Sequence, residues 1–190
     1  MDLQNKIRLH PRAREFLFEN YYTTRKLFSD VLGQLEVDYI SMAFINSSRQ
    51  IFFLSSAPSI EQNLIETGSW KYEGIYQPDF IFQDKPKLWA ELPAAGSYMK
   101  QQMENKNFCN IGISMIDTDD YHRIVFSFGF KKLQPLIESK HPQHCKKLLH
   151  LGKYCLRELK RTILFPELQK SVKSQLRLII NNEVIHEKNE

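Results

Sequence analysis

The sequence contains little glycine and little cysteine, and neither residue falls in a pattern that serves a known chemistry. Its 7 glycines do not form the glycine-rich loops that hold phosphate groups. Its 3 cysteines, Cys109, Cys145 and Cys155, are an odd number without the spacing of a disulfide framework. We therefore expect reduced thiols and no nucleotide-binding loop.

Long hydrophobic runs are also missing. No segment approaches the roughly 18 consecutive apolar residues that a membrane-spanning helix needs. The charged start of the chain is not followed by the apolar stretch of a signal peptide. We therefore expect a cytoplasmic protein that does not associate with membranes. Hydrophobic residues nevertheless make up 42% of the chain and include 13 phenylalanines, which is enough for the core of one domain.

The net charge of +4 is distributed unevenly along the chain. Residues 131–190 hold 13 of the 26 basic residues but only 6 of the 22 acidic ones. Such a distribution fits either a surface that faces a polyanion or helices that expose solvated lysines. We favour the second interpretation because no DNA-recognition helix can be identified in the chain. Nucleic acid is therefore not expected as a partner.

Hydrophobic periodicity predicts an α+β fold. The predicted helices cover residues 11–35, 59–67, 89–105, 142–164 and 167–180, and the predicted hairpins cover residues 37–56 and 108–130. Because short turns join antiparallel strands, we expect a central antiparallel sheet in a PAS/GAF-like α-β-α sandwich. Pro166 divides the chain into a ligand-sensing domain, residues 1–165, and a C-terminal amphipathic helix and tail, residues 166–190.

Aromatic residues gather where the predicted loops meet the central strands. A Tyr-Gln-Pro step at residues 76–78 and a Pro-x-x-Trp step at residues 86–89 precede the strand that carries residues 112–114, Gly-Ile-Ser. Aromatic walls with a few polar anchors are typical of sites that bind small molecules. The segment therefore predicts a small apolar or amphipathic ligand in a cavity beneath Trp89.

These steps resemble motifs of the autoinducer-binding domain of LuxR-type transcription regulators. Residues 76–78 resemble the Tyr-Asp-Pro step of that family, residues 86–89 its Pro-x-x-Trp step, and residues 112–114 the Gly-x-Ser of its central strand. The resemblance covers residues 15–163. It implies a GAF/PAS-like sandwich that senses a small signalling molecule in transcription regulation and quorum sensing.

Three features of that family are changed or missing in this sequence. Gln77 takes the place of the aspartate that accepts the amide proton of an acyl-homoserine lactone, and a neutral amide is a weaker acceptor than a carboxylate. The tryptophan and tyrosine of the acyl channel fall on Leu64 and Gly68, unless a shifted loop brings in Trp70 or Tyr72. The residues after 166 are too few for the helix-turn-helix that reads DNA.

The resemblance and the aromatic pattern together predict a ligand-binding site. Tyr76 and Trp89 would form its lid, with the indole N–H donating to a ligand carbonyl. A core tryptophan whose N–H is satisfied within the protein is the competing interpretation. The predicted ligand-binding residues are Trp70, Tyr72, Tyr76, Gln77, Trp89, Ser114 and Phe126.

Potential metal ligands occur in two places, and neither matches a known site. His141, His144 and Cys145 lack further ligands at a familiar zinc spacing. The acidic run over residues 117–120 lacks the glycine and the distal glutamate of a calcium loop. It fits a hairpin turn better, so we expect no metal.

A catalytic site is equally hard to find. Cys109 and His122 fall on partner strands of the second predicted hairpin, but a thiol in a buried strand is usually inert. No acid–base pair or cofactor loop accompanies them. We therefore expect no cofactor and no enzymatic activity.

Two functions from different classes remain open. The first is a ligand-sensing regulatory domain, in which binding biases the helix over residues 142–164 and acts on a partner or on a homodimer formed through the C-terminal helices. The second is a protein-interaction module, such as a regulator or a bacterial effector, with a filled core and no ligand. A void beneath Trp89 favours the first function, and a solid core favours the second.

Overall fold

Four central strands with apolar side chains on both faces form the middle of the structure. The computed structural model describes residues 6–83, 85–92, 109 and 111–166. Its six-stranded sheet has the order β1-β3-β2-β6-β5-β4. The strands are β1 (Arg8–Leu9), β2 (Tyr39–Asn46), β3 (Gln50–Ser55), β4 (Lys87–Leu88), β5 (Ile111–Thr118) and β6 (His122–Phe130).

The centre of the sheet is antiparallel, and its edges are short. β2 pairs with β3 and with β6, and β6 pairs with β5, all antiparallel. The predicted α+β class, both hairpins and the antiparallel centre are therefore confirmed. The sheet as a whole is mixed, because β1 pairs with β3 in parallel. The edge strands β1 and β4 have 2 residues each, too few to show a strand period in the sequence.

Alternation along β6 divides its side chains between two hydrophobic clusters. Ile124, Phe126 and Phe128 enter one cluster with helices α2 (Tyr21–Val31) and α7 (Pro142–Thr162). Val125 enters the other cluster with helices α3 (Pro58–Glu66) and α4 (Pro78–Ile81) and with Trp89. We call these two sides the α7 face and the Trp89 face of the sheet. β2 is buried along its whole length because it too is covered on both faces.

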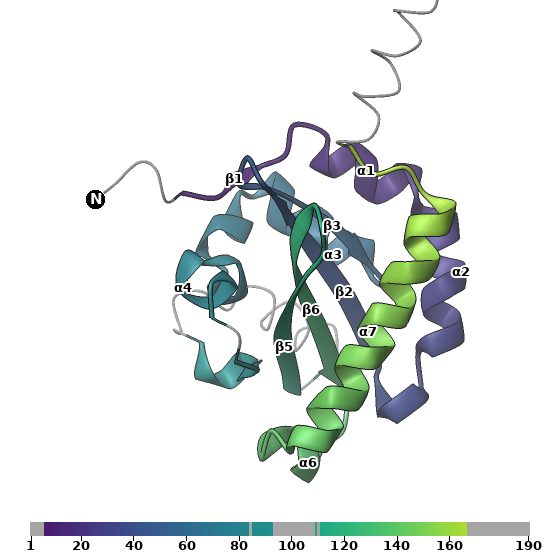
Figure 1. Cartoon of the computed structure of the whole chain (residues 1–190), viewed down its shortest axis with the longest axis vertical. Coiled ribbons are helices and arrows are strands. Elements are labelled where there is room, and N and C mark those ends of the chain that lie inside the picture. The colour runs from purple at the N-terminus through teal and green to yellow at the C-terminus, as the bar shows by residue number, and fades with distance from the viewer. Residues whose placement is uncertain (1–5, 84, 93–108, 110, 167–190) are drawn as a thin grey trace, which may run out of the picture.

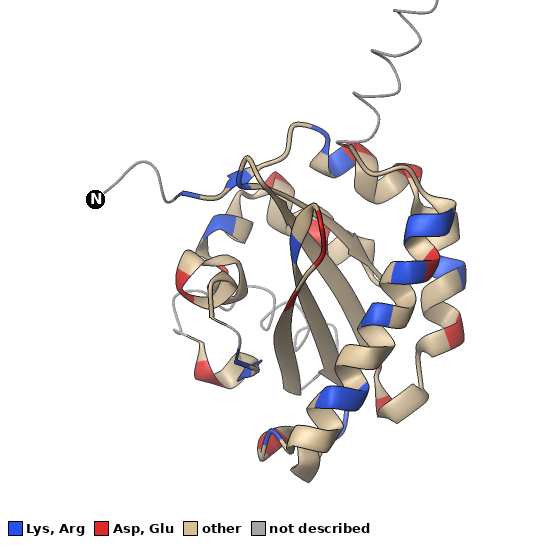
Figure 2. Cartoon of the chain, in the orientation of Figure 1, with Lys and Arg blue, Asp and Glu red and all other residues tan. Residues whose placement is uncertain are grey.

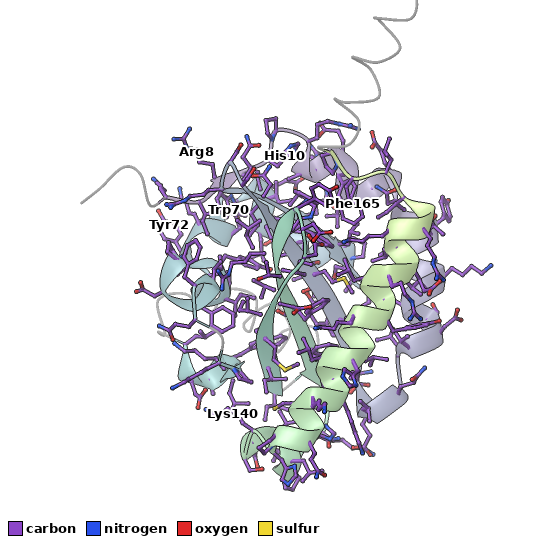
Figure 3. The ribbon with its side chains drawn as sticks, viewed as in Figure 1. Arg8, His10, Trp70, Tyr72, Lys140 and Phe165 are labelled. Carbon is purple, nitrogen blue, oxygen red and sulfur yellow. The ribbon has the colours of Figure 1, made fainter. Side chains whose placement is uncertain are left out.

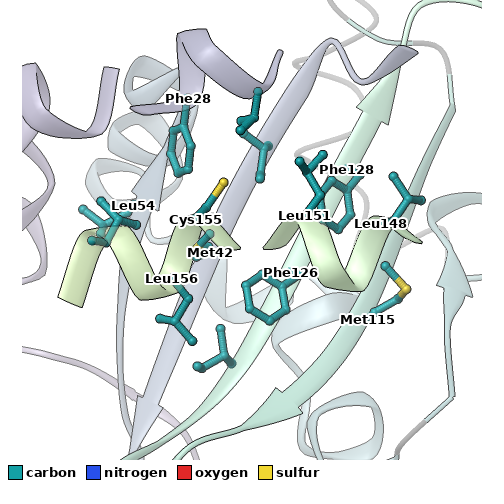
Figure 4. Packing of buried hydrophobic residues seen from close by; sticks show 14 of the residues in the cluster. Phe28, Met42, Leu54, Met115, Phe126, Phe128, Leu148, Leu151, Cys155 and Leu156 are labelled. Atoms are coloured by element: carbon teal, nitrogen blue, oxygen red, sulfur yellow. The ribbon is translucent and has the colours of Figure 1, made fainter. Parts of the chain in front are cut away.

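Helix α7 confirms the helix predicted over residues 142–164. It begins with a proline at a first-turn position, where the missing N–H costs no hydrogen bond. Its buried residues are Cys145, Leu148, Leu151, Gly152, Cys155, Leu156 and Leu159, which share one face because they lie three or four positions apart. Figure 1 shows α7 crossing the sheet with α2 beside it, and Figure 4 shows the side chains that meet between α7 and the strands.

The single helix predicted over residues 11–35 is wrong, because the structure has two helices there. α1 (Ala13–Glu19) stops at Asn20, whose side-chain amide donates a hydrogen bond to the carbonyl of Phe16 at 3.0 Å. Asparagine side chains compete in this way for backbone groups. α2 follows and ends before Gly33, whose φ of 86° turns the chain into the 3-10 turn η2 (Gln34–Glu36). The apolar period continues across the break, so it does not reveal it.

Short elements cover the Trp89 face. After α3 come the 3-10 turns η3 (Ser69–Tyr72) and η4 (Gly74–Tyr76), then α4, β4 and the 3-10 turn η5 (Trp89–Glu91). Of the helix predicted over residues 89–105, only η5 is described, and residues 93–108 lie outside the described residues. The helix predicted over residues 167–180 also lies outside them. α6 (Pro135–Glu138) precedes α7. Within the described ranges no helix is both long and apolar enough to cross a bilayer.

Gly152→Ala should destabilise the protein, although alanine normally favours a helix by about 1 kcal/mol over glycine. A Cβ at this position would lie 2.7 Å from Cδ1 of Phe126, and Phe126 is fully buried. We expect a net loss of about 1–3 kcal/mol in the free energy of unfolding, measured by urea denaturation. In a Phe126→Leu background the same change should cost less. An equal cost in both backgrounds would contradict this explanation.

Candidate ligand-binding site

Trp89 lies flat against the backbone of the central sheet. It begins η5 directly after β4 and is 4% exposed. A Cβ built on Gly112 of β5 would stand 2.1 Å from Cδ2 of the indole, far closer than any real contact. The glycine is therefore required for the ring to approach the strand. This explains why the Gly-Ile-Ser step and the Pro-x-x-Trp step occur together.

The indole N–H of Trp89 is satisfied inside the protein. Nε1 donates a hydrogen bond to Oγ of Ser114 at 3.0 Å, and Ser114 shares a second hydrogen bond with Oγ of Ser127 at 2.8 Å. The chain thus joins Trp89 to both β5 and β6. The sequence predicted both Trp89 and Ser114 as ligand contacts, and the structure brings them together, but as partners of each other.

A cluster of buried tyrosines and glutamates lies on the same face. It consists of Tyr39 from β2, Glu61 from α3, and Glu73 and Tyr76 from the turns after α3, and none is more than 2% exposed. Tyr39 donates a hydrogen bond from its hydroxyl to Oε1 of Glu61, and its ring meets that of Trp89 edge-on at 6.1 Å. We call these four residues the Tyr–Glu cluster.

The pKa values of both tyrosines are raised by burial and by nearby carboxylates. Burial raises the pKa of Tyr39 well above 10, and the negative charge of Glu61 raises it further. Burial likewise raises the pKa of Tyr76 well above 10, with added contributions from the charges of Glu61 and Glu73. Both phenols therefore stay protonated and remain possible donors at neutral pH.

Sequence reasoning found Tyr76 but missed the other three members of the Tyr–Glu cluster. The available signal is the position of Glu61 on α3, between Ile60 and Leu64, which are 1% exposed. A glutamate on the apolar side of an amphipathic helix is rarely buried without a specific role. Tyr39 offers no comparable signal, because a tyrosine at the start of a strand is ordinary.

Gln77 closes a turn in this structure. Its side-chain Nε2 donates hydrogen bonds to the carbonyls of Lys71 at 2.7 Å and Glu73 at 3.1 Å. Both donors of the amide are therefore used by the local backbone. Gln77 thus supports the loop between α3 and α4.

Trp70 and Tyr72 lie at the rim of this face. Trp70 is partly buried against the Trp89-face cluster, while Tyr72 is 55% exposed and carries the ammonium of Lys71 over its ring at 5.0 Å. Figure 3 shows both residues on the side of the molecule away from α7. Of the predicted set, Tyr76, Trp89 and Ser114 are buried together, and Trp70 and Tyr72 border them.

Phe126 does not belong with these residues. It packs into the α7-face cluster, where its ring lies against the backbone of Gly152. Its neighbours in β6, Val125 and Ser127, face Trp89, so the strand alternation places Phe126 on the opposite side of the sheet. The prediction that Phe126 shares a site with Trp89 is therefore corrected.

Two hollows formed by described residues lie away from Trp89. One, of about 460 Å³, is lined by α2 and α7 and includes Asp30, His150 and Tyr154. The other, of about 300 Å³, lies at the turns β2–β3 and β5–β6 and includes Arg49 and Phe82. The cavity predicted beneath Trp89 is neither of these two.

The remaining reactive side chains are arranged for packing. Burial raises the pKa of the Cys109 thiol to about 12, and Cys109 lies in the Trp89-face cluster. His122 instead contacts the rings of Phe44 and Phe52 on the α7 face, so the two do not form a pair. All three cysteines are free. The described residues contain no group of three or more histidine, cysteine or acidic side chains placed to hold a metal ion.

Two solved structures of bacterial proteins have a similar fold. Escherichia coli SdiA aligns with a TM-score of 0.58 and 15% identity over 89% of this chain and 78% of that one. CepR2 from Burkholderia cenocepacia, an N-acylhomoserine lactone-dependent LuxR family transcription factor, aligns with a TM-score of 0.54 and 13% identity over 80% of this chain and 99% of that one. The resemblance to LuxR-type proteins is therefore confirmed for the fold. By sequence the chain matches no family model and no curated protein.

Gly112→Ala should displace the indole of Trp89, because the new methyl group would occupy the space of the ring. The chain has 2 tryptophans, so a Trp70→Phe background makes Trp89 the sole tryptophan. We expect its fluorescence to shift to longer wavelength and the free energy of unfolding to fall by about 1–3 kcal/mol. Thr118→Ala, at the exposed end of the same strand, is the control. An unchanged emission spectrum in Gly112→Ala would disprove the close contact.

Proposed function

We propose that the chain is a ligand-sensing regulatory domain that binds a small amphipathic molecule on the Trp89 face of its sheet. The main support is the similarity of its fold to CepR2, a lactone-dependent transcription factor. The alignment covers 99% of the CepR2 chain. The Tyr–Glu cluster adds support from this chain itself, because buried polar groups among aromatic walls are what small-molecule sites use to orient a ligand. Cytoplasmic location and a role in transcription regulation and quorum sensing belong to the same proposal.

The proposal does not assign a lactone as the ligand. Gln77 uses both of its amide donors within a turn, and the indole N–H of Trp89 is held by Ser114. Two of the polar contacts implied by the resemblance therefore serve the protein itself.

Binding on the Trp89 face would reach α7 through the sheet and through two ion pairs. Lys153 contacts Asp117 at 3.1 Å, and Lys160 contacts Asp119 at 2.9 Å, so α7 is joined to the β5–β6 hairpin end. The other end of β5 lies under Trp89. A ligand can shift α7 through this arrangement only if it binds two conformations of the hairpin with different affinities.

The basic residues of α7 are largely engaged with acidic side chains. Figure 2 shows lysines and arginines along the outer side of this helix. Besides Lys153 and Lys160, both Arg157 and Arg161 contact Glu158 at 3.1 Å. This pairing favours solvated ion pairs over a phosphate-binding surface. The target of α7 in this proposal is therefore a partner protein or a second copy of the chain.

A protein-interaction module with a filled core is the second candidate function. The observation that favours it is the packing around Trp89, where Tyr39, Phe53, Tyr76 and Phe80 are all at most 2% exposed. In that case the fold would serve as a scaffold, and α7 with the groove beside α2 would form the contact surface.

Native mass spectrometry of the purified protein distinguishes the two functions. For a sensor we expect a bound small molecule that Trp89→Ala loses and Trp70→Ala keeps, since Trp70 lies at the rim. Trp89→Phe, which preserves an aromatic wall, should keep part of the bound mass. No bound molecule in the unaltered protein would favour the interaction module. Full retention by Trp89→Ala would remove Trp89 from the site.

Asp119→Asn should weaken the link between α7 and the hairpin in a pH-dependent way. Burial raises the pKa of Asp119, but hydrogen bonds from Lys160 and from the N–H groups of Tyr121 and His122 outweigh it and lower the pKa. A lowered pKa stabilises the fold above the pKa of the unfolded state, about 3.9, and this contribution disappears as the pH falls through the folded pKa.

At pH 7 we therefore expect Asp119→Asn to reduce the free energy of unfolding by about 1 kcal/mol, with little difference from the unaltered protein near pH 2. Urea denaturation at both pH values measures this. Asp120→Asn, at the exposed neighbouring position, is the matched control and should cost little at either pH. A cost that is the same at both pH values would disprove the role of the Asp119 charge.

A further inference from the structure

A groove lies between helices α2 and α7 on the surface of the protein. It has a volume of about 460 Å³, and its apolar lining is formed by Leu35, Leu151 and Tyr154. Leu151 is 9% exposed, whereas Tyr154 is 41% exposed. Lys147 and His150 of α7 add polar side chains. Figure 1 shows the two helices side by side, and we call the hollow between them the α2–α7 groove. An apolar groove with polar edges is the kind of surface into which amphipathic helices pack.

The chain leaves the described structure on the same side of the sheet as this groove. Phe165 is 3% exposed and belongs to the α7-face cluster. Its ring lies 5.1 Å from the ring of Phe44 and 5.7 Å from the ring of Phe16. Residues 167–190 follow and lie outside the described residues. They therefore start from a fixed point on the α7 face.

The sequence of residues 167–180 is that of an amphipathic helix. Its apolar positions share one side at helical spacing, and these are Leu168, Val172, Leu176 and Ile179. Three basic residues occupy the opposite side, and these are Lys170, Lys173 and Arg177. Such a helix needs an apolar surface for one side and water for the other.

The segment is long enough to reach the groove. From Thr162, the last residue of α7, back to Lys147 is ~22 Å along the helix axis. Residues 163–166 add at most ~13 Å, even if they extend directly away from the groove. A helix over residues 167–180 is ~21 Å long, and residues 181–190 can add up to ~33 Å. A course antiparallel to α7 therefore brings residues 181–190 to Lys147.

The charges of the segment and of the groove are complementary. Within the described ranges, Lys146 and Lys147 form no ion pair with an acidic side chain, whereas Lys153 and Lys160 farther along α7 are paired. The first turn of α7 also carries no acidic residue. Residues 181–190 contain three glutamates and one lysine. The acidic end of the segment would thus arrive where the lysines of α7 have no acidic partner.

We propose that residues 167–180 form an amphipathic helix that packs into the α2–α7 groove of the same chain, with residues 181–190 beside Lys146 and Lys147. A segment joined to its site by a short linker has an effective concentration on the order of millimolar, which favours it over a second copy of the chain. The inference goes beyond the proposed sensing function and holds for either candidate function. A partner of α7 that uses this groove must displace the helix, so the segment limits access to α7.

Hydrogen–deuterium exchange of the full chain, followed by mass spectrometry of peptides, tests this docking. We expect the amides of residues 170–180 to exchange at least about tenfold faster in Tyr154→Glu than in the unaltered protein, because a charge in the groove opposes the apolar contact. Leu176→Glu should have a similar effect and should also speed exchange in the last turn of α2. Lys146→Glu combined with Lys147→Glu should speed exchange of residues 170–180 severalfold, because it replaces attraction by repulsion.

Tyr22→Glu and Lys26→Glu are the matched controls, because both residues are exposed on α2 and neither lines the groove; both should leave exchange of residues 170–180 unchanged. If Tyr154→Glu fails to fold, Leu176→Glu and the lysine variant decide. Fast exchange of residues 170–180 in the unaltered protein overturns the proposal, as does slow exchange that the groove variants do not alter. Slow exchange that requires high protein concentration, with a dimer in native mass spectra, would overturn it in favour of docking on a second copy.

Discussion

The structure depends on a sheet whose central strands are buried on both faces. Because side chains alternate along a strand, neighbouring residues of β6 belong to different clusters. Phe126 supports α7, while Ser127 binds the serine that holds Trp89. A single strand thus carries the contacts of the helical layer and of the candidate site, and neither layer can be packed without the other.

Two glycines set the thickness of this arrangement. Gly112 allows the indole of Trp89 to lie on the strand from one side, and Gly152 allows α7 to lie on Phe126 from the other. At each contact, an aromatic ring occupies the space that a side chain on the glycine would fill. The layers therefore approach more closely than they could if both partners carried side chains. The position of Trp89 relative to α7 is therefore fixed by packing across one sheet, with two ion pairs at the hairpin end.

The sequence predicts the repetitive parts of this fold and misses the parts held by single contacts. Both hairpins and α7 were accessible because their apolar residues repeat over many positions. The break at Asn20 depends on one side-chain hydrogen bond, and β1 depends on pairing with a strand some 40 residues away. At the candidate site, aromatic residues identified Trp89 and Tyr76, whereas the partnership of Trp89 with Ser114 and the burial of Glu61 and Glu73 depend on contacts between distant segments. Phe126 was misassigned because being aromatic says nothing about the face on which a residue lies.

The alternation of side chains between the two faces of the sheet has an evolutionary consequence. Residues that pack around Trp89 and residues that hold α7 alternate along the same stretch of chain, so each set can change while its neighbours are retained. A lineage can thus change the side chains around Trp89 on one side of the sheet without rebuilding the side that packs against α7.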